Sequence, residues 1–308
     1  MKKTLVLLSL FIFCFLGQSQ VDIAVEYMDK KDLVYRNLDS ALVEPNNVYH
    51  LDLSMQLLKK FPEEIFELQN LQTANLSFNR FTELPENIGQ LESLKELNLR
   101  GNLLSELPPS FARLKNLEKL WLAQNPIEKI PQEIKQLKKI NTLDFSFCSI
   151  LVLPDFIGEL ENLDYLNLTK NILDTLPASF SNLSKLTKLD LGSNRFYLIP
   201  QEICSLLNLK HLDLSINQIS SLPKNISNLK KLEYLALSSN RIEEVSKELF
   251  LLNNLKTLDL SYNHTLQVIP SSIENMEKLK TLKLFGTSIL QERINKLIEL
   301  LPNCEVLH

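Results

Sequence analysis

One short segment of the chain carries the residue types of a hydrolase, at His211, Asp213 and Ser215. A histidine base beside a serine is the arrangement that activates a nucleophile. The alternate spacing predicts a β-strand, however, along which His211 and Ser215 would lie about 13 Å apart at roughly 3.3 Å per residue. A base needs to be about 2.6–3.2 Å from its nucleophile. The spacing argues against a catalytic triad, and we expect no enzymatic activity.

Metal and cofactor sites are not expected either. Cys148, Cys204 and Cys304 are widely spaced, and no Cys-x-x-Cys pair is present to bind zinc. Aspartate recurs at one position of a repeating pattern, which favours a structural or solubilising role. A cation bridging Asp190 and Asp213, on strands about 4.8 Å apart, is the alternative.

Composition excludes two further classes of function. The chain has six glycines, where average usage of about 7% would give roughly twenty, so a glycine-rich phosphate loop is not expected. Its formal charge is 33 minus 37, or −4. A protein without excess cations is poorly suited to a phosphate backbone, and we expect no nucleic-acid partner.

Residues 1–19 have the order of a secretory signal peptide. Lys2 and Lys3 precede an apolar run that ends at Leu16, and small or polar residues follow. The run has about twelve apolar residues, fewer than the roughly twenty that a spanning helix needs. We expect cleavage near Ser19, no membrane span afterwards, and a secreted, periplasmic or cell-surface protein.

A period of 23 residues governs most of the chain. Nine successive intervals are 23 residues long and the tenth is 24. The eleven repeats, numbered 1 to 11 below, span residues 48–288 and begin at Val48, Leu71, Leu94, Leu117, Ile140, Leu163, Leu186, Leu209, Leu232, Leu255 and Leu279.

Periodicity changes within each repeat. Leu120 and Leu122 alternate with Lys119, Trp121 and Ala123, which predicts a short half-buried strand. Ile134 and Leu137 are three residues apart and follow Pro131, which predicts a turn or two of helix with proline at its first position.

An asparagine follows the predicted strand in most repeats, where a buried amide can bond the backbone of adjacent turns. Cys148 replaces it in repeat 5, Gln56 in repeat 1 and Thr287 in repeat 11. The asparagine column comprises Asn79, Asn102, Asn125, Asn171, Asn194, Asn217, Asn240 and Asn263.

The repeat resembles the leucine-rich repeat, in the 23-residue class known from secreted bacterial proteins and Ras-associated scaffolds. Its pattern is L-x-x-L-x-L-x-x-N-x-L-x-x-L-P-x-x-I-x-x-L-x-x. The resemblance implies an α/β fold, a horseshoe solenoid with a concave parallel sheet and short helical or 3-10 convex segments. It names no ligand.

Both ends of a solenoid need capping. We expect residues 20–47 to hold the N-terminal segment and cap, and residues 289–308 the C-terminal helix and cap. Ser288 and Gln291 resemble a capping box for that helix, and residues 304–306 alternate like a final strand. Val245-Ser246 in repeat 9 and an extra residue near His264 in repeat 10 depart from the pattern, which suggests drift or a local bulge.

The outward side chains of the strands form a continuous surface suited to a protein partner. Trp121 is the only tryptophan and stands in a column of mostly Asp and Asn. Aromatic residues with arginine are typical of binding hot spots. The predicted partner-binding residues are Trp121, Tyr165, Arg100, Lys119, Phe147, Glu96 and Asp144, and a second cluster comprises Tyr234, Tyr262, Phe285 and His211.

The sequence thus favours an exported, non-enzymatic bacterial monomer that binds a protein through its concave face. Two alternatives stay open. One is a cytoplasmic signalling scaffold, because Ras-associated proteins share this class of repeat. The other is a carbohydrate-binding surface component, because Trp121 and Tyr165 could stack on sugars.

Overall fold

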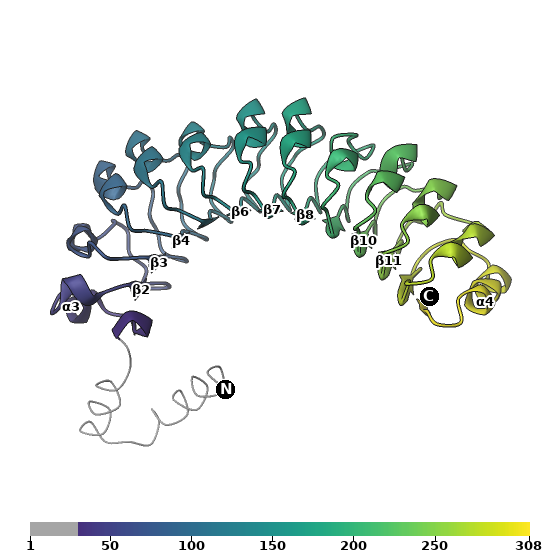
Figure 1. Cartoon of the computed structure of the whole chain (residues 1–308), viewed down its shortest axis with the longest axis horizontal. Coiled ribbons are helices and arrows are strands. Elements are labelled where there is room, and N and C mark those ends of the chain that lie inside the picture. Colours follow the sequence, from purple (N-terminus) through teal and green to yellow (C-terminus); the bar gives the residue numbers. More distant parts are fainter. Residues whose placement is uncertain (1–29) are drawn as a thin grey trace, which may run out of the picture.

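The computed structural model describes residues 30–308, and these form one curved arc with a parallel sheet on its concave side (Figure 1). Strand order follows chain order throughout the described sheet. Its strands are β1 (Val34–Tyr35), β2 (His50–Asp52), β3 (Thr73–Asn75), β4 (Glu96–Asn98), β5 (Lys119–Trp121), β6 (Thr142–Asp144), β7 (Tyr165–Asn167), β8 (Lys188–Asp190), β9 (His211–Asp213), β10 (Tyr234–Ala236), β11 (Thr257–Asp259), β12 (Thr281–Lys283) and β13 (Glu305–Leu307).

Short helices line the convex side, and the predicted fold class is confirmed. Two described segments are α-helical, α3 (Leu38–Ala41) and α4 (Gln291–Leu300). The 3-10 helices are η1 (Lys30–Asp32), η2 (Pro45–Asn47), η3 (Glu63–Glu67), η4 (Glu86–Gln90), η5 (Pro109–Arg113), η6 (Gln132–Gln136), η7 (Asp155–Glu159), η8 (Ala178–Asn182), η9 (Ile203–Ser205), η10 (Lys224–Asn228), η11 (Lys247–Leu251) and η12 (Ser271–Asn275).

The core lies between the sheet and the 3-10 helices. Leu97, Leu120 and Leu143 are register partners at the centres of successive strands, and all three are fully buried. Because every turn buries the same positions, each repeat is stabilised mainly by its two neighbours.

The asparagine column forms the predicted ladder of buried amides. Asn125 accepts a hydrogen bond from the backbone N–H of Leu104 at 3.0 Å. Its amide nitrogen donates to the carbonyl oxygens of Leu99 at 3.0 Å and Leu122 at 2.9 Å. One side chain therefore satisfies backbone groups of two adjacent repeats, as the sequence predicts.

Repeat 5 breaks this ladder. The Cys148 sulfur lies 3.4 Å from the carbonyl oxygen of Leu122 and 3.5 Å from that of Ser146. Burial raises the pKa of this thiol to about 11, which keeps it protonated and unreactive. The next residue, Ser149, has φ +70°, whereas the residues that follow the asparagines are not in this left-handed region.

Cys148→Asn is expected to stabilise the protein by about 1 kcal/mol, because an amide would restore a strong acceptor and two donors at a buried site. Urea unfolding of the variant and the parent protein would measure the change. A matched Cys204→Asn variant, at a buried cysteine outside the column, should instead destabilise the protein. Loss of stability in Cys148→Asn would contradict the proposed role of the ladder.

A left-handed residue precedes the asparagine position in every one of the eleven repeats, with φ between +55° and +68°. We call these residues the left-handed column. Glycine, which adopts this conformation without strain, fills the column at Gly101 and Gly286. The other members are Met55, Phe78, Gln124, Phe147, Lys170, Ser193, Ile216, Ser239 and Tyr262.

A second ladder of side-chain hydrogen bonds, which the sequence analysis did not predict, lies at the ends of the repeats. Asparagine and lysine alternate along it from one repeat to the next. The Asn116 amide donates to the carbonyl oxygen of Glu92 at 2.8 Å, and its oxygen accepts from Lys139 at 2.7 Å. Asn162 and Lys185 repeat this arrangement two turns later. We call this the asparagine–lysine ladder, and it has a period of two repeats.

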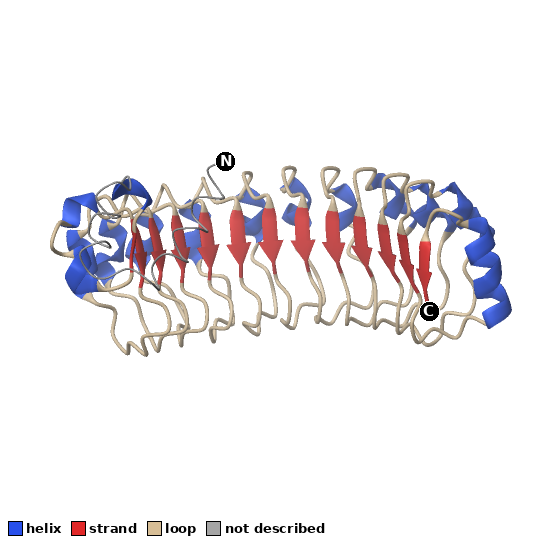
Figure 2. Cartoon of the chain, turned by 90° about the horizontal axis from the view of Figure 1, so that it is seen from below, coloured by secondary structure: helices blue, strands red, loops and turns tan. Residues whose placement is uncertain are grey.

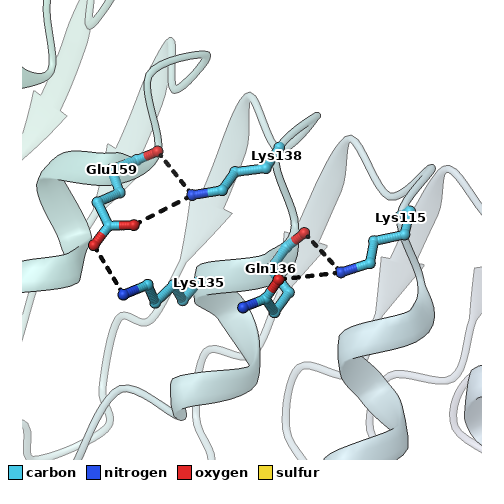
Figure 3. Close-up of polar contacts among 5 residues, drawn as sticks. All are labelled: Lys115, Lys135, Gln136, Lys138 and Glu159. Carbon is cyan, nitrogen blue, oxygen red and sulfur yellow. Dashed lines mark hydrogen bonds and ion pairs between the residues drawn. The ribbon is translucent and has the colours of Figure 1, made fainter.

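Exposed polar contacts join the convex turns (Figure 3). Glu159 lies 3.0 Å from Lys135 and 3.4 Å from Lys138, while Lys115 donates to Gln136. The hydrogen bond from Lys135 lowers the pKa of Glu159. Such exposed pairs contribute little to stability because water competes for both charges.

Two local expectations are corrected, and one strand is added. The helix-opening proline, Pro131 for example, is the N-cap residue rather than the first helical one. Helix α4 has Leu290 as its N-cap without a side-chain cap, so the capping box is wrong; the Ser288 hydroxyl donates instead to the carbonyl oxygen of His264 in the preceding repeat. Strand β1, which pairs with β2, was not predicted.

The predicted signal peptide at residues 1–19 lies outside the described residues. Between residues 30 and 308, no helix has the length and apolar character needed to cross a bilayer.

Candidate functional site

The first part of the predicted site is assembled by strands β4 to β6. Trp121 lies in register between Asn98 and Asp144. In the adjacent row, Lys119 forms an ion pair with Glu96 at 2.8 Å. Trp121 is half-buried, so part of its indole ring remains accessible. We call Glu96, Arg100, Lys119, Trp121 and Asp144 the Trp121 surface.

Asp144 contributes less to this surface than the sequence suggests. Its side chain is buried and accepts a hydrogen bond from the backbone N–H of Ser146 at 2.9 Å. The same contact, from a strand-end Asp or Asn to the N–H two residues later, occurs at Asp52, Asn75, Asn98, Asn167, Asp213 and Asp259. The acidic column is therefore largely structural.

Arg100 and Phe147 lie at the rim of the sheet. Arg100 donates to the side-chain oxygen of Gln124 at 3.1 Å and lies 5.7 Å from the ring centroid of Phe78. Phe147 belongs to the left-handed column and is 41% exposed, with the ammonium of Lys170 at 4.5 Å from its ring. Both residues are held in place before any partner arrives.

Tyr165 belongs to a different group of contacts from Trp121. Its hydroxyl donates to Asp190 Oδ2 at 2.8 Å, and Lys188 Nζ lies 4.3 Å from its ring centroid. One face of the ring is thus covered by an ammonium group. This arrangement does not favour the stacking of sugars on Tyr165.

Asp190 is the centre of that second group, which we call the Asp190 cluster. Lys188 lies 3.3 Å and His211 3.0 Å from its carboxylate, on the same and the next strand. Every other aspartate or asparagine of this column in the described chain accepts a hydrogen bond from the backbone N–H two residues later, whereas Asp190 does not. Its carboxylate instead gathers Tyr165, Lys188 and His211 on the concave surface.

The residue two positions after Asp190 is Gly192, and its backbone lies close to the side chains of the next strand. A Cβ there would lie 3.1 Å from Ser215 Oγ and 3.4 Å from Asp213 Oδ2. Most other strands carry a serine, threonine or arginine at this position. The sequence signal for the cluster was therefore this glycine, which sequence reasoning did not use.

His211 is correctly predicted to lie on the concave face, but its carboxylate partner is Asp190 rather than Asp213. The contact is diagonal across two adjacent strands, because His211 is in register with Lys188 and Asp190 is in register with Asp213. His211 also stacks on Tyr234, with ring centroids 4.3 Å apart and an interplanar angle of 2°.

The second predicted cluster is divided in the structure. Tyr234 packs with His211, whereas Tyr262 lies in the left-handed column of repeat 10. The ring of Tyr262 covers Gly286, where an added Cβ would approach it to 2.7 Å. Tyr262 and Phe285 therefore belong to the rim of the sheet.

Burial alone would raise the pKa of Asp190, but hydrogen bonds from His211 and Tyr165 and the charge of Lys188 outweigh this effect and lower it. A depressed pKa in the folded state stabilises the fold above the ordinary pKa of about 3.9, and this contribution is lost as pH falls through the depressed value.

Asp190→Asn is therefore expected to destabilise the protein by about 1 kcal/mol at pH 7. The difference from the parent should shrink as the pH falls below about 4. Urea unfolding at pH 7 and at pH 3 would test this, with Asp174→Asn, at an exposed site outside the cluster, as the control. A difference that grows toward acid would contradict the assignment.

No constellation for metal binding is assembled among residues 30–308. The oxygens of Asp190 already accept from Tyr165 and His211, and Asp213 accepts from Ser215 N–H at 2.8 Å. These contacts favour a binding surface over a cation site.

The two departures from the repeat meet in space. Glu243, Glu244 and Val245 of repeat 9 line a hollow of about 730 Å³ together with His264 and Thr265 of repeat 10. The Thr265 hydroxyl donates to the carbonyl oxygen of Ile242 at 3.0 Å, and Arg293 of α4 donates to that of Gln267. The extra residue thus forms an ordered bulge tied to its neighbours.

Sequence comparisons agree with the repeat assignment. Residues 46–104, 94–150 and 140–196 match the family described as leucine rich repeat, and residues 198–307 match the leucine-rich repeat region family. No curated protein gives a significant match to the sequence.

Solved structures share the fold. A TDR receptor is 30% identical over 90% of this chain and 50% of its own, with a TM-score of 0.72. InlJ from Listeria monocytogenes is 22% identical, with coverage of 85% and 53% and a TM-score of 0.70. The ectodomain of the Arabidopsis thaliana receptor kinase GASSHO1/SCHENGEN3, in complex with Casparian strip integrity factor 2, is 28% identical, with coverage of 78% and 35% and a TM-score of 0.54. This chain spans about half or less of each.

Proposed function

Because this chain belongs to the leucine-rich repeat family, whose members commonly bind proteins, we propose that it is an exported, non-enzymatic protein that binds a protein partner through its concave face. The observation that carries the proposal is the row of ordered aromatic and charged side chains from Trp121 to Tyr234, on an open sheet. The basic, apolar and polar order of residues 1–19 supports export.

Preorganisation would be the source of affinity. Lys119 is held by Glu96, and Tyr165, Lys188 and His211 are held by Asp190. Ordering such side chains costs free energy on association, and here the fold has already ordered them. Trp121 supplies the apolar area that hot spots commonly use.

A solved structure of the same fold supports a protein ligand. The GASSHO1/SCHENGEN3 ectodomain is a leucine-rich repeat domain in complex with a named factor. The present chain matches about a third of that structure's chain, so the partner of this protein is to be found by experiment.

The test is affinity capture from envelope and extracellular fractions, followed by measurement of Kd with the purified partner. Trp121→Ala is expected to weaken binding about 30-fold, corresponding to roughly 2 kcal/mol. Leu207→Ala, at an exposed apolar residue of the convex side, is the matched control and should bind like the parent protein. Mass measurement of the exported chain would show whether residues 1–19 are removed.

Two results would overturn the proposed site. One is unchanged affinity in both Trp121→Ala and Asp190→Asn, and the other is an equal loss in Leu207→Ala. Capture of a glycan that Trp121→Ala no longer binds, without any protein partner, would replace protein recognition by carbohydrate recognition.

A further inference from the structure

The loops that leave the strands run along one flank of the arc, at the lower edge of Figure 2. Each of repeats 1 to 10 exposes two adjacent residues there, shortly before the position that holds proline in most repeats. We call these the flank pairs: Lys59–Lys60, Thr82–Glu83, Ser105–Glu106, Glu128–Lys129, Leu151–Val152, Asp174–Thr175, Tyr197–Leu198, Ser220–Ser221, Glu243–Glu244 and Gln267–Val268.

The flank is basic at its N-terminal end. Lys59 and Lys60 form no ion pair with any residue that the structure describes. They line a hollow of about 550 Å³ together with Arg80, and Glu63 and Glu83 lie on its border. Cations outnumber anions here, so this end suits an acidic partner surface.

The opposite end is acidic. Glu243 and Glu244 line the hollow of about 730 Å³ at repeats 9 and 10. Neither glutamate has an ion-pair partner between residues 30 and 308. Arg241, two residues before Glu243, reduces the negative charge of this loop without reversing it.

Two apolar pairs lie in the middle of the flank, with the polar pair Asp174–Thr175 between them. Leu151, Val152, Tyr197 and Leu198 are between 51% and 60% exposed. Leu151 and Val152 border a hollow of about 570 Å³ whose lining includes Ile130. Exposed apolar residues that gather in this way mark interaction surfaces.

A second copy of the chain that runs in the opposite direction would place its acidic end against the basic end of the first copy. A two-fold axis through repeat 5 would place repeat n of one copy opposite repeat 10 − n of the other. Repeat 1 would then meet repeat 9, so that Lys59 and Lys60 face Glu243 and Glu244. Repeat 5 would meet itself, and Leu151 and Val152 would pack on their own copies.

Two of the remaining repeat pairs can be compared on the same axis. Repeat 7, with Tyr197 and Leu198, would meet repeat 3, whose flank pair is Ser105–Glu106 and whose Leu103, two residues earlier, is 53% exposed. Repeat 4 would meet repeat 6, bringing Lys129 opposite Asp174. The complementary contacts are therefore those of repeat 1 with repeat 9, of repeat 5 with its own copy, and of Lys129 with Asp174.

The left-handed column has five exposed apolar members, and three of them agree with this axis. Phe78, Phe147 and Ile216 stand in repeats 2, 5 and 8, whereas Met55 and Tyr262 stand in repeats 1 and 10 and have no apolar counterpart. Reversal about repeat 5 pairs Phe78 with Ile216, and Phe147 with its own copy.

The curvature of the arc is compatible with this arrangement. Rotation by 180° about an axis that passes radially through repeat 5 maps a circular arc onto itself and turns its flank over. The two copies would therefore curve in the same direction, with their flanks in contact over repeats 1 to 9 and both concave sheets open (Figures 1 and 2).

We propose that the flank is the interface of an antiparallel homodimer, in which the basic end of each copy binds the acidic end of the other and the apolar middles pack at the two-fold axis. This replaces the monomer expected from the sequence. A closed, two-fold interface uses the same patch twice, so each charge contact is formed two times.

Sedimentation equilibrium of the purified full chain tests the proposal. The parent protein is expected to be dimeric at micromolar concentration. Lys59→Glu with Lys60→Glu, and separately Glu243→Lys with Glu244→Lys, should each raise the dimer Kd about tenfold or more, because like charges then face each other at both ends. Lys224→Glu with Lys247→Glu, on the convex side, is the matched control and should stay dimeric.

Mixing the two charge-reversed proteins gives the decisive result. In the mixed dimer both charge contacts are restored, so the mixture is expected to form a one-to-one heterodimer although each variant alone is monomeric. This outcome also shows that both variants are folded. A monomeric parent protein, or a mixture that associates no better than its components, would overturn the proposal.

Discussion

Asn125→Ala is expected to lower the free energy of unfolding by about 2–4 kcal/mol. The side chain of Asn125 is 3% exposed and bonds Leu104 N–H and the carbonyl oxygens of Leu99 and Leu122. Alanine would leave these groups buried without partners. Water cannot easily replace the amide, because the core of adjacent turns closes around it.

Lys138→Ala is the matched control. Lys138 also bridges two repeats, through Glu159, but both side chains are about half exposed (Figure 3). Its loss should cost less than about 0.5 kcal/mol. Urea unfolding measures both variants, and equal midpoints would contradict the assigned role of the asparagine column.

Gly158→Ala is expected to destabilise the protein by about 2–3 kcal/mol, although it adds one methyl group. Gly158 is buried in η7, and a Cβ there would overlap the carbonyl oxygen of Ser179 in η8. A backbone carbonyl cannot turn aside as a side chain can. The two convex turns would have to separate, and the packing behind them would loosen.

Gly192→Ala is the control for this effect. A Cβ at Gly192 would first meet the Ser215 hydroxyl at 3.1 Å, and this group can rotate. Thermal unfolding should show a much smaller change than in Gly158→Ala. If both substitutions are equally tolerated, the convex turns are not as closely packed as the structure indicates.

Periodicity was sufficient to predict most of the fold. Leu120 and Leu122 indicate a strand, and the asparagine column indicates a turn. These assignments hold in every repeat because each repeat buries the same positions against its two neighbours. Strand β1 was missed because it precedes its partner by 16 residues rather than 23, as Val34 pairs with His50. The capping box failed because Ser288 bonds a neighbouring turn, a contact that local sequence does not reveal.

The site was less predictable than the fold. The register brought Glu96 to Lys119 and Trp121 to Asn98 as expected, since these follow from the period alone. Whether a strand-end aspartate turns back to its own backbone or outward to its neighbours depends on several side chains together. Asp190 turns outward beside Gly192, and the glycine, at a position that is mostly serine, threonine or arginine, was the signal that sequence reasoning did not use.

The asparagine–lysine ladder constrains how the number of repeats could change. Asn116 needs a lysine in the following repeat and a backbone carbonyl in the preceding one. Removal of a single repeat would bring two asparagines or two lysines together, whereas removal of two would rejoin an asparagine to a lysine. Lengthening or shortening this protein, by evolution or by engineering, should therefore proceed most easily in steps of 46 residues, the length of two 23-residue repeats.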